Sequence, residues 1–388
     1  MSEKLRIGMV GGGPGAFIGE IHRLALGMTG RFELVAGAFS RDAERSRAFG
    51  VELGLDAERS YGSFGALFRG EAARPADERM DCVAIVTPND SHADITCAAL
   101  ESGFHVICDK PAAGTLEDAL RMEAAVERSG LVFGLTHTYT GYPLVIEARE
   151  RIAAGELGEI RRVAVSYLQD WLSREEDTTG SKQAEWRNDP ARSGEAGAFA
   201  DIGTHAFNLV EFMTGRRITR LAAQLRSVLP DRVIDDDGAC LFELDNGAAG
   251  QLSASQVCTG AINALRIEIY GSEASLHWFQ EEPNQLSLRK RGEPERVLRP
   301  GAGTPYLSDA AQAVCRTPGG HPEGYIEAFA NLYDAFAQDV AAYPAPPATP
   351  RGYATIADGV GALRFIRAAR RSSEAGSGWT ELAGIESA

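Results

Sequence analysis

The sequence predicts an α/β domain with a parallel sheet, followed by an α+β domain with a large, mostly antiparallel sheet. Three observations lead to this prediction. A short apolar strand ends in a run of glycines before a helix with one apolar face, strands and helices then alternate to about residue 136, and later strands follow one another through short turns. At 388 residues the chain is also long enough for two cores. We therefore expect a first domain at residues 1–136 and a second at residues 137–388.

The first domain is predicted from alternating strand and helix patterns. Leu5–Val10 is expected to be a strand that runs into the turn Gly11–Gly15, and apolar residues at helical spacing follow from Phe17 to Met28. Thr115 followed by Asp118 resembles a helix capping box, and Gly130 stands where a helix commonly ends. The other predicted strands are Phe32–Phe39, Cys82–Thr87, His105–Cys108 and Leu131–Leu135, and the other helices are Asp90–Ser102 and Thr115–Ser129. Such alternation indicates a parallel sheet covered on both faces.

The second domain is predicted from strands that no longer alternate with helices. Leu144–Ala154 is expected to be a helix, and Ile160–Tyr167 alternates with the period of a strand. Asp245-Asn246-Gly247 is a hairpin signal between the strands Ala239–Leu244 and Ala249–Ser255. Further strands are expected at Leu265–Tyr270, Ser275–Phe279, Leu286–Lys290 and Arg296–Leu298, and helices at Gly324–Ala342 and Thr355–Arg371. We expect these last two helices to pack back on the rest of the chain.

Composition and charge exclude several classes of function. The net charge of −15 disfavours nucleic acid and anionic membranes as main partners, because both repel an acidic protein. The six cysteines are scattered without a C-x-x-C pair, and no histidine–carboxylate cluster has metal-ligand spacing, so neither a metal site nor a disulfide framework is predicted. No apolar run approaches the roughly 18 residues of a membrane span, and no signal-peptide pattern is present. We expect a cytoplasmic protein.

The glycine turn predicts a dinucleotide site in a Rossmann-type domain. Glycines after a first strand let the backbone approach a pyrophosphate at a helix N-terminus. Gly11 and Gly13 match the first two glycines of G-x-G-x-x-G/A, and either Ala16 or Gly19 can take the third place. At the end of the second strand, Ser40 and Arg41 can bind a 2′-phosphate, which favours NADP over NAD, although Asp42 could serve a ribose hydroxyl.

Two further segments stand at the C-terminal ends of predicted strands, where open α/β sheets bind ligands. Thr87-Pro88-Asn89-Asp90-Ser91-His92 and Gly103-Phe104-His105-Val106-Ile107-Cys108-Asp109-Lys110-Pro111 resemble T-P-N-x-x-H and G-x-H-V-x-C-[E/D]-K-P of the glucose–fructose oxidoreductase / inositol dehydrogenase / rhizopine catabolism (Gfo/Idh/MocA) family. A third segment, from Gly197 to His205, resembles that family's G-x-x-x-D-x-G-x-H, and Trp186-Arg187 and Tyr142-Pro143 stand where the family often has similar pairs. The family's Glu-Lys-Pro is Asp-Lys-Pro here. The glycine loop of this chain is three residues longer than that of the family.

The resemblance implies an NAD(P)-dependent oxidoreductase that moves a hydride between nicotinamide and a secondary alcohol or ketone of a sugar, sugar derivative or cyclitol. His205 is the expected acid/base, since histidine titrates near neutral pH. Asp201 would orient the imidazole or bind substrate hydroxyls, and Lys110 would stabilise the developing alkoxide. The alternative for His205 is a buried structural histidine, because its neighbours in sequence are apolar.

The residue patterns and the resemblance together give the remaining site residues. Substrate is expected to contact the three catalytic residues together with His137, Tyr139, Tyr142 and Arg187. Cofactor is expected at Gly11, Gly13, Gly15, Ala16, Phe17, Ile18, Ser40, Arg41, Thr87, Pro88, Asn89, His92, Asp109, Lys110, Trp186 and Arg187. Two other activities remain open: an NAD-dependent glycosidase of the same fold that uses transient oxidation and elimination, and a non-catalytic sugar-sensing regulator. An exposed face of the antiparallel sheet is expected to form a homodimer or homotetramer.

Overall fold

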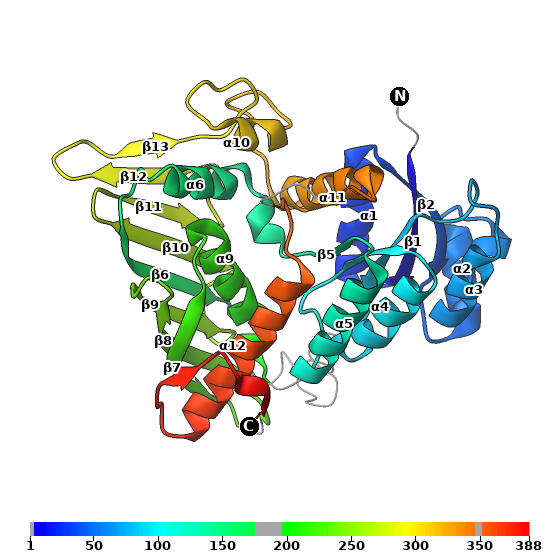
Figure 1. The fold of residues 1–388 in the computed structure, drawn as a ribbon, viewed down its shortest axis with the longest axis horizontal. Coiled ribbons are helices and arrows are strands. Elements are labelled where there is room, and N and C mark those ends of the chain that lie inside the picture. Colours follow the sequence, from blue (N-terminus) through cyan, green and yellow to red (C-terminus); the bar gives the residue numbers. More distant parts are fainter. Residues whose placement is uncertain (1–3, 175–195, 231, 346–350, 388) are drawn as a thin grey trace. The chain divides into compact units, whose positions relative to one another are not determined.

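The computed structural model describes residues 4–174, 196–230, 232–345 and 351–387 (Figure 1). The chain divides into two compact units. Unit 1 comprises Met1–Thr138 and Phe329–Val360, and unit 2 comprises Tyr139–Ala328 and Gly361–Ala388. These units differ from the domains predicted from the sequence chiefly in the segment Phe329–Val360, which joins the N-terminal unit.

Unit 1 is built on a parallel five-stranded sheet, as the sequence predicts, with strand order β2-β1-β3-β4-β5. Beside β2, an isolated parallel bridge joins Ser60 to Gly37. The Rossmann strand order has a sixth strand at this edge, and here a single bridged residue takes its place. The strands are β1 (Leu5–Gly11), β2 (Phe32–Ala38), β3 (Cys82–Val86), β4 (His105–Cys108) and β5 (Phe133–Leu135). The helices are α1 (Phe17–Thr29), α2 (Ala43–Glu52), α3 (Phe64–Ala72), α4 (His92–Glu101) and α5 (Leu116–Ser129), with short turns η1 (Ala57–Arg59) and η2 (Asn89–Ser91).

Local sequence signals explain where the helices of unit 1 begin and end. The helix start predicted at α5 is confirmed, because Thr115 Oγ1 accepts a hydrogen bond from the Asp118 backbone N–H at 3.2 Å and donates one to Asp118 Oδ2 at 3.0 Å. Gly130 ends the same helix with a φ of +65°, a conformation that glycine adopts without steric cost. β3 is buried along its whole length, which matches its unbroken apolar sequence.

A histidine and a tyrosine form a buried pair between α1 and α11. His22 is fully buried, and its Nδ1 lies 2.6 Å from the hydroxyl of Tyr333. Burial lowers the pKa of His22 to about 4, although the nearby Asp109 carboxylate acts in the opposite direction. Burial likewise lowers the pKa values of His105 and His137 to about 4. All three imidazoles are therefore neutral in the folded protein at neutral pH.

These histidines predict a loss of stability in mild acid. A folded-state pKa of about 4 lies below the unfolded value of about 6.5, so between these values the unfolded chain binds more protons, and the free energy of unfolding falls as the pH is lowered. For His22 alone we expect a loss of about 2 kcal/mol between pH 7 and pH 5. Urea unfolding followed by circular dichroism should show that His22→Asn removes this part of the pH dependence, whereas the exposed-site variant His321→Asn leaves it in place. Equal pH dependence in His22→Asn and the unmodified protein would contradict the neutral buried state.

Unit 2 is built on a nine-stranded sheet of order β13-β12-β11-β10-β6-β9-β8-β7-β14. Its strand pairs are antiparallel except β6 and β9, which are parallel neighbours. The strands are β6 (Ile160–Leu168), β7 (Ile218–Arg226), β8 (Asp237–Leu244), β9 (Ala249–Ser255), β10 (Ala264–Gly271), β11 (Ala274–Phe279), β12 (Leu286–Lys290), β13 (Arg296–Leu298) and β14 (Thr380–Glu381). The mostly antiparallel sheet predicted from the sequence is confirmed.

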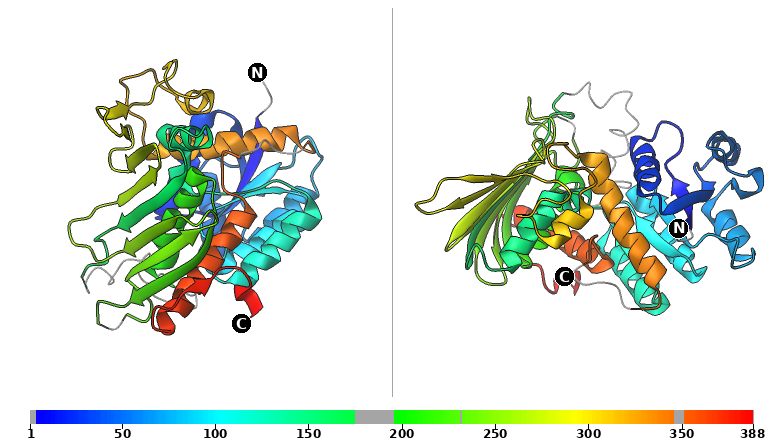
Figure 2. Two further views of the ribbon diagram at one scale, coloured as in Figure 1. Left: turned by 60° about the vertical axis from the view of Figure 1, so that its left-hand side comes forward. Right: turned by 90° about the horizontal axis from the view of Figure 1, so that it is seen from above.

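Helices cover one face of this sheet, as the edge-on view shows (Figure 2). Helix α9 contacts β6, β9 and β10, α6 contacts β11, and Ser372 of α12 accepts a hydrogen bond from the Ala223 backbone N–H. The bounds in the chain are η3 (Thr138–Gly141), α6 (Pro143–Ala153), the π-helical turn η5 (Phe199–Gly203), α9 (Thr204–Thr214), α10 (Asp309–Val314), α11 (Tyr325–Ala342), α12 (Ile356–Glu374) and η6 (Ile385–Ser387). Phe365 of α12 stacks on Phe199 and Phe207, so aromatic packing fixes η5 and α9 in the core of unit 2.

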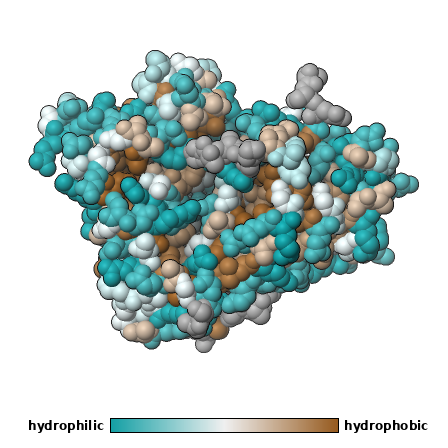
Figure 3. All heavy atoms as spheres, viewed as in Figure 1, coloured by the Kyte–Doolittle hydropathy of each residue, from teal (hydrophilic) through white to brown (hydrophobic). Residues whose placement is uncertain are grey.

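The described helices include none with the length and apolar character needed to cross a membrane. On the face drawn in Figure 3, hydrophilic side chains cover most of the surface, and apolar side chains show in smaller patches between them.

Candidate active site

The glycine turn after β1 leaves no room for side chains. Gly11 has a φ of +84°, and a Cβ there would lie 2.2 Å from the Val86 carbonyl oxygen, while a Cβ on Gly13 would lie 2.3 Å from the carbonyl oxygen of Phe39. A Cβ on Gly19 would lie 2.3 Å from the Cα of Gly12, so this glycine lets α1 pack closely on the turn. This packing favours Gly19 for the third place of the motif, which the sequence leaves open, and Ala16 is the residue before the first turn of α1. This bare backbone fits a dinucleotide pyrophosphate.

An arginine of α1, which the sequence analysis missed, binds the backbone of the glycine turn. Arg23, two turns into α1, donates a hydrogen bond from Nη1 to the Gly12 carbonyl oxygen at 2.7 Å. Burial of the guanidinium lowers the pKa of Arg23 from its usual value. No motif marks this position in the sequence, because the contact depends on how α1 packs against the turn.

The three polar residues after β2 are Ser40, Arg41 and Asp42, and only Asp42 caps a helix. Asp42 caps α2, since its carboxylate accepts a hydrogen bond from the Arg45 backbone N–H at 2.9 Å. Ser40 Oγ accepts from the Asp42 backbone N–H at 3.1 Å. The side chain of Arg41 is 77% exposed and lies 3.4 Å from the carboxylate of Asp90, which follows β3. The end of β2 therefore presents a hydroxyl and a guanidinium, with the carboxylate of Asp42 engaged as a helix cap and that of Asp90 paired with Arg41.

His92 joins the loops that follow β3 and β4. Its imidazole is fully buried, with Nε2 2.8 Å from the Thr87 carbonyl oxygen and Nδ1 2.9 Å from that of Pro111. Ser91 adds a hydrogen bond from Oγ to Thr87 Oγ1 at 2.8 Å. With both ring nitrogens facing backbone carbonyls, His92 fits a role in holding the two loops better than the direct cofactor contact expected from the sequence. Asn89, at the start of η2, is also largely buried.

Asp109 and Lys110 follow β4. Asp109 Oδ1 accepts hydrogen bonds from the Lys110 backbone N–H at 2.9 Å and from Thr136 Oγ1 at 2.8 Å. Asp109, whose side chain is shorter than the family's glutamate, therefore binds the residue that follows β5 and the backbone of its own loop. The next residue, His137, is buried. Burial lowers the pKa of His137 most, and the positive charge of Lys110 lowers it further. Lys110, Asp109 and His137 are thus brought together within unit 1.

In unit 2, Asp201 and His205 lie on one continuous helical segment. Asp201 belongs to the π-helical turn η5, a structure that is frequent at functional sites, and His205 to the first turn of α9. Asp201 Oδ2 accepts a hydrogen bond from Gln256 Nε2 at 2.8 Å. His205 is 8% exposed, and its ring meets that of Tyr139 edge-on with centroids 4.8 Å apart. The Nδ1 atom of His205 is buried, so Nε2 is the ring nitrogen that a ligand would reach.

A network of hydroxyl and amide groups backs His205. The hydroxyls of Tyr139 and Tyr167 lie 2.5 Å apart, Tyr167 donates to Asn263 Oδ1 at 2.6 Å, and Asn263 Nδ2 donates to Tyr139 Oη at 3.2 Å. Gln169 Nε2 adds a hydrogen bond to Asn263 Oδ1 at 2.8 Å. Burial raises the pKa values of Tyr139 and Tyr167, so both remain protonated donors.

Three expected site residues are placed differently or lie outside the described part of the chain. Tyr142 is 2% exposed, stacked behind Tyr139 and against Trp278, which fits a packing role better than substrate contact. Trp186 and Arg187 fall outside the described residues. Tyr167, Asn263 and Gln256 were not found from the sequence, because they lie at or beyond strand ends and belong to no motif. The described residues contain no group of three or more potential metal ligands.

Comparison with known proteins places both units in one family. Residues 5–137 match the oxidoreductase family with an NAD-binding Rossmann fold, and residues 145–277 match the GFO/IDH/MocA C-terminal domain. The uncharacterized oxidoreductase YfiI of Bacillus subtilis is 36% identical over 98% of each chain. The levoglucosan dehydrogenase of Pseudarthrobacter phenanthrenivorans is 28% identical over 74% of this chain and 76% of its own.

A solved structure extends the similarity to the whole fold. An inositol dehydrogenase homologue of Azotobacter vinelandii complexed with NAD⁺ is 37% identical, with a TM-score of 0.92 over 98% of each chain. The same homologue complexed with NADH and myo-inositol superposes with a TM-score of 0.90, again over 98% of each chain. These matches confirm the resemblance and the oxidoreductase class expected from the sequence. The chain therefore belongs to the GFO/IDH/MocA family of oxidoreductases and carries that family's NAD-binding domain.

Proposed function

We propose that this protein is an NAD(P)-dependent dehydrogenase that oxidises a secondary alcohol of a sugar or cyclitol to a ketone. The observation that carries the proposal is the environment of His205 in unit 2. An imidazole that is 8% exposed shares its helical segment with the carboxylate of Asp201, and its ring contacts the rings of Tyr139 and Tyr167, whose hydroxyls bond to each other and to Asn263. Such a set suits a ligand with several hydroxyl groups, and relatives named for levoglucosan and inositol support that ligand class.

The chemistry divides between the cofactor and this chain's own side chains. When bound, NAD(P)⁺ supplies the hydride acceptor, so one C–H hydrogen leaves the substrate with its electron pair, and the hydroxyl proton leaves separately. His205 takes that proton, at Nε2 since Nδ1 is buried. Lys110 is assigned, by the family resemblance alone, to stabilise the negative charge that develops on the reacting oxygen. Asp201, with one oxygen held by Gln256, orients the imidazole or a neighbouring substrate hydroxyl.

A coupled screen tests the proposal. The purified protein is mixed with NAD⁺ or NADP⁺ and with a panel of inositols, aldoses and anhydrosugars, and the absorbance of the reduced nicotinamide is followed. We expect net NAD(P)H formation with at least one polyol and an equal amount of ketone. Release of an aglycone from a glycoside without net NAD(P)H would favour the glycosidase alternative, and ligand binding without turnover would favour a sugar sensor.

For the cofactor we propose a preference for NADP over NAD, set by Ser40 and Arg41. A guanidinium that pairs with the 2′-phosphate forms charge-assisted hydrogen bonds worth about 1.5–3 kcal/mol, or roughly 10–100-fold in affinity. We expect Arg41→Ala to lower kcat/KM for NADP⁺ by about tenfold or more while kcat/KM for NAD⁺ changes little. Ser40→Asp should add a carboxylate that repels the phosphate and should reverse the preference. Arg31→Ala, which removes a surface ion pair with Asp334, is the matched control.

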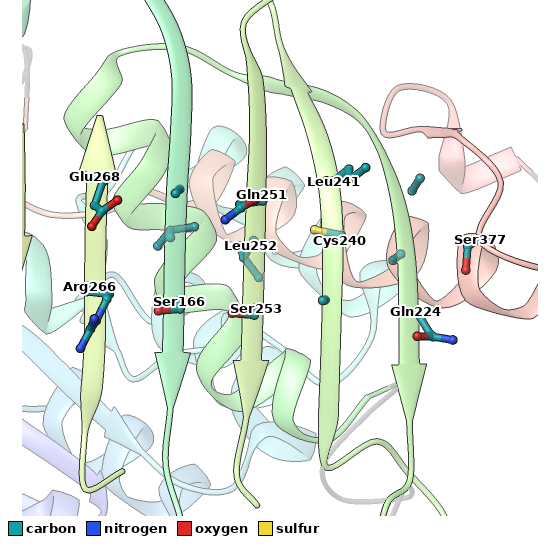
Figure 4. Close-up of a pocket in the computed structure, with 15 residues that line it drawn as sticks. Ser166, Gln224, Cys240, Leu241, Gln251, Leu252, Ser253, Arg266, Glu268 and Ser377 are labelled. Carbon is teal, nitrogen blue, oxygen red and sulfur yellow. The ribbon is translucent and has the colours of Figure 1, made fainter. Parts of the chain in front are cut away.

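We also propose that the uncovered face of the large sheet joins two copies of the chain. The shallow pocket on this face is lined mostly by small or uncharged side chains from five neighbouring strands, with Arg266 and Glu268 at one end, and its lining residue Leu241 is 54% exposed (Figure 4). Arg266 and Glu268, two residues apart on β10, face the same side, so a two-fold axis can bring the cation of one copy to the anion of the other. A second copy is therefore the occupant this face fits.

Light scattering tests the dimer. We expect a mass of at least twice 41.5 kDa for the unmodified protein and a shift towards 41.5 kDa for Leu241→Lys, because a buried lysine would be desolvated at the interface. Val228→Lys, at a similarly exposed apolar residue outside the pocket, should leave the mass unchanged. A monomeric unmodified protein would reject the dimer.

A further inference from the structure

Asp235 binds the backbone at the start of the helical segment that carries Asp201 and His205. Its two carboxylate oxygens accept hydrogen bonds from the backbone N–H groups of Gly197 and Phe199, each at 2.8 Å. Its own carbonyl oxygen accepts a third from the Ala198 backbone N–H at 2.9 Å. One residue of the segment before β8 therefore satisfies three successive N–H groups of a helix start.

This contact is tight and comes from far along the chain. A Cβ on Gly197 would lie 2.0 Å from the Asp235 carbonyl oxygen, so only glycine allows the approach. Helix starts are commonly capped by a residue just before the first turn, whereas this cap lies more than 30 residues later in the sequence. Burial raises the pKa of Asp235, and the N–H donors of Phe199 and Gly197 act in the opposite direction. The carboxylate thus gives up hydration for contacts with this one turn.

The next residue completes a second connection to the same site. The carbonyl oxygen of Asp236 accepts a hydrogen bond from the Gln256 backbone N–H at 2.9 Å, and Gln256 Nε2 donates to Asp201 Oδ2 at 2.8 Å. The carboxylate of Asp236 accepts from the backbone N–H groups of Val228 and Leu229 at 2.7 and 3.1 Å. Asp235 and Asp236 therefore hold Asp201 both through the backbone of its helix and through the amide that binds its carboxylate.

We propose that Asp235 is a positioning residue for Asp201 and His205. The backbone N–H of Asp201 donates to the Gly197 carbonyl oxygen at 2.9 Å, and the Gly197 N–H is one of those held by Asp235, so two hydrogen bonds link the Asp235 carboxylate through Gly197 to the backbone of Asp201. His205 follows one turn later on the same segment. The inference rests on the proposed dehydrogenase function, because it assigns these two side chains to the reaction.

Asp235→Asn and Asp235→Ala test the inference, with Asp237→Asn as control. Asparagine keeps the shape and one acceptor, alanine keeps neither, and Asp237 forms an exposed ion pair with Arg226 and does not contact the helix start. A displacement of about 1 Å at a catalytic group can cost about 100-fold in rate. We expect kcat to fall roughly 10-fold in Asp235→Asn and roughly 100-fold in Asp235→Ala, with the Kd for NAD(P)H unchanged and a larger primary deuterium isotope effect on kcat. A residue that acts only on stability would leave the isotope effect where it is.

A second readout does not depend on turnover. In protein carrying ¹³C-labelled histidine, the Cε1–H resonance of His205, assigned by its loss in His205→Asn, should move in Asp235→Asn and stay in Asp237→Asn. If the resonance moves but the unmodified protein oxidises no polyol, the proposed function fails and the positioning role stands. If resonance and isotope effect both stay unchanged, or if neither Asp235 variant folds, Asp235 serves stability alone and the inference is overturned.

Discussion

Replacing Lys110 with alanine is expected to lower kcat/KM for the polyol by about 100–1,000-fold, the range seen when one electrostatic stabiliser of a developing oxyanion is removed. The ammonium stands after β4, in a loop that Asp109 fixes through the Lys110 backbone N–H and the Thr136 hydroxyl. Because these contacts hold the backbone of Lys110 and not its ammonium, we expect the fold and the melting temperature to change little. Steady-state kinetics with saturating cofactor measure the effect.

Lys290→Ala is the matched control for Lys110. Lys290 forms an ion pair with Glu156 at 3.1 Å on β12, far from any predicted site residue in the sequence, and such partly exposed pairs contribute at most about 1 kcal/mol. Its removal should leave kcat/KM within about twofold. Unimpaired turnover in Lys110→Ala would remove Lys110 from the reaction.

Replacing His205 with asparagine is expected to lower kcat/KM by about 100–10,000-fold, the contribution typical of a general base. The imidazole packs edge-on against Tyr139, and asparagine keeps a polar group in that place with less volume. The remaining activity should rise with pH, because hydroxide or water must then take the proton. pH–rate profiles of the two proteins measure this difference.

Two controls separate a chemical role of His205 from a structural one. Tyr139→Phe keeps the ring against His205 but removes the hydroxyl that bonds Tyr167 and Asn263, so it tests the hydroxyl network apart from the imidazole and should lower the rate less than His205→Asn does. His321→Asn changes an exposed histidine in a loop and should have no effect. If His205→Asn kept full activity with an unchanged pH profile, His205 would be the buried structural histidine that its apolar neighbours in sequence suggest.

The sequence predicted the architecture well where the signals are local. The strand β1, its glycine turn and the start of α5 each depend on neighbouring residues, and the structure confirms them. The strand β7 was missed because Ile218–Arg226 mixes small, charged and apolar residues without a clean alternation. The parallel pairing of β6 with β9 could not be predicted either, since strand order in a sheet is set by packing across the whole unit.

The candidate site was predicted through motifs, and what lies outside motifs was missed. Gly19 and Ala16 were equal candidates until the contact between Gly19 and Gly12 was seen, because only the packing distinguishes them. Asn263 and Gln256 are single polar residues beyond strand ends, and Asp235 acts through backbone groups of residues 197 to 199. Such long-range hydrogen bonds leave no spacing pattern in a sequence.

Transfer of deuterium tests the central claim most directly. The protein is incubated with NAD(P)⁺ and with an active polyol that carries deuterium on its carbinol carbons, and both products are analysed by NMR and mass spectrometry. A dehydrogenase should give NAD(P)H with one deuterium at nicotinamide C4 for each molecule of ketone formed. Product formation without a labelled reduced nucleotide, or no product with any polyol of the panel, would contradict the assignment of this chain as a sugar or cyclitol dehydrogenase.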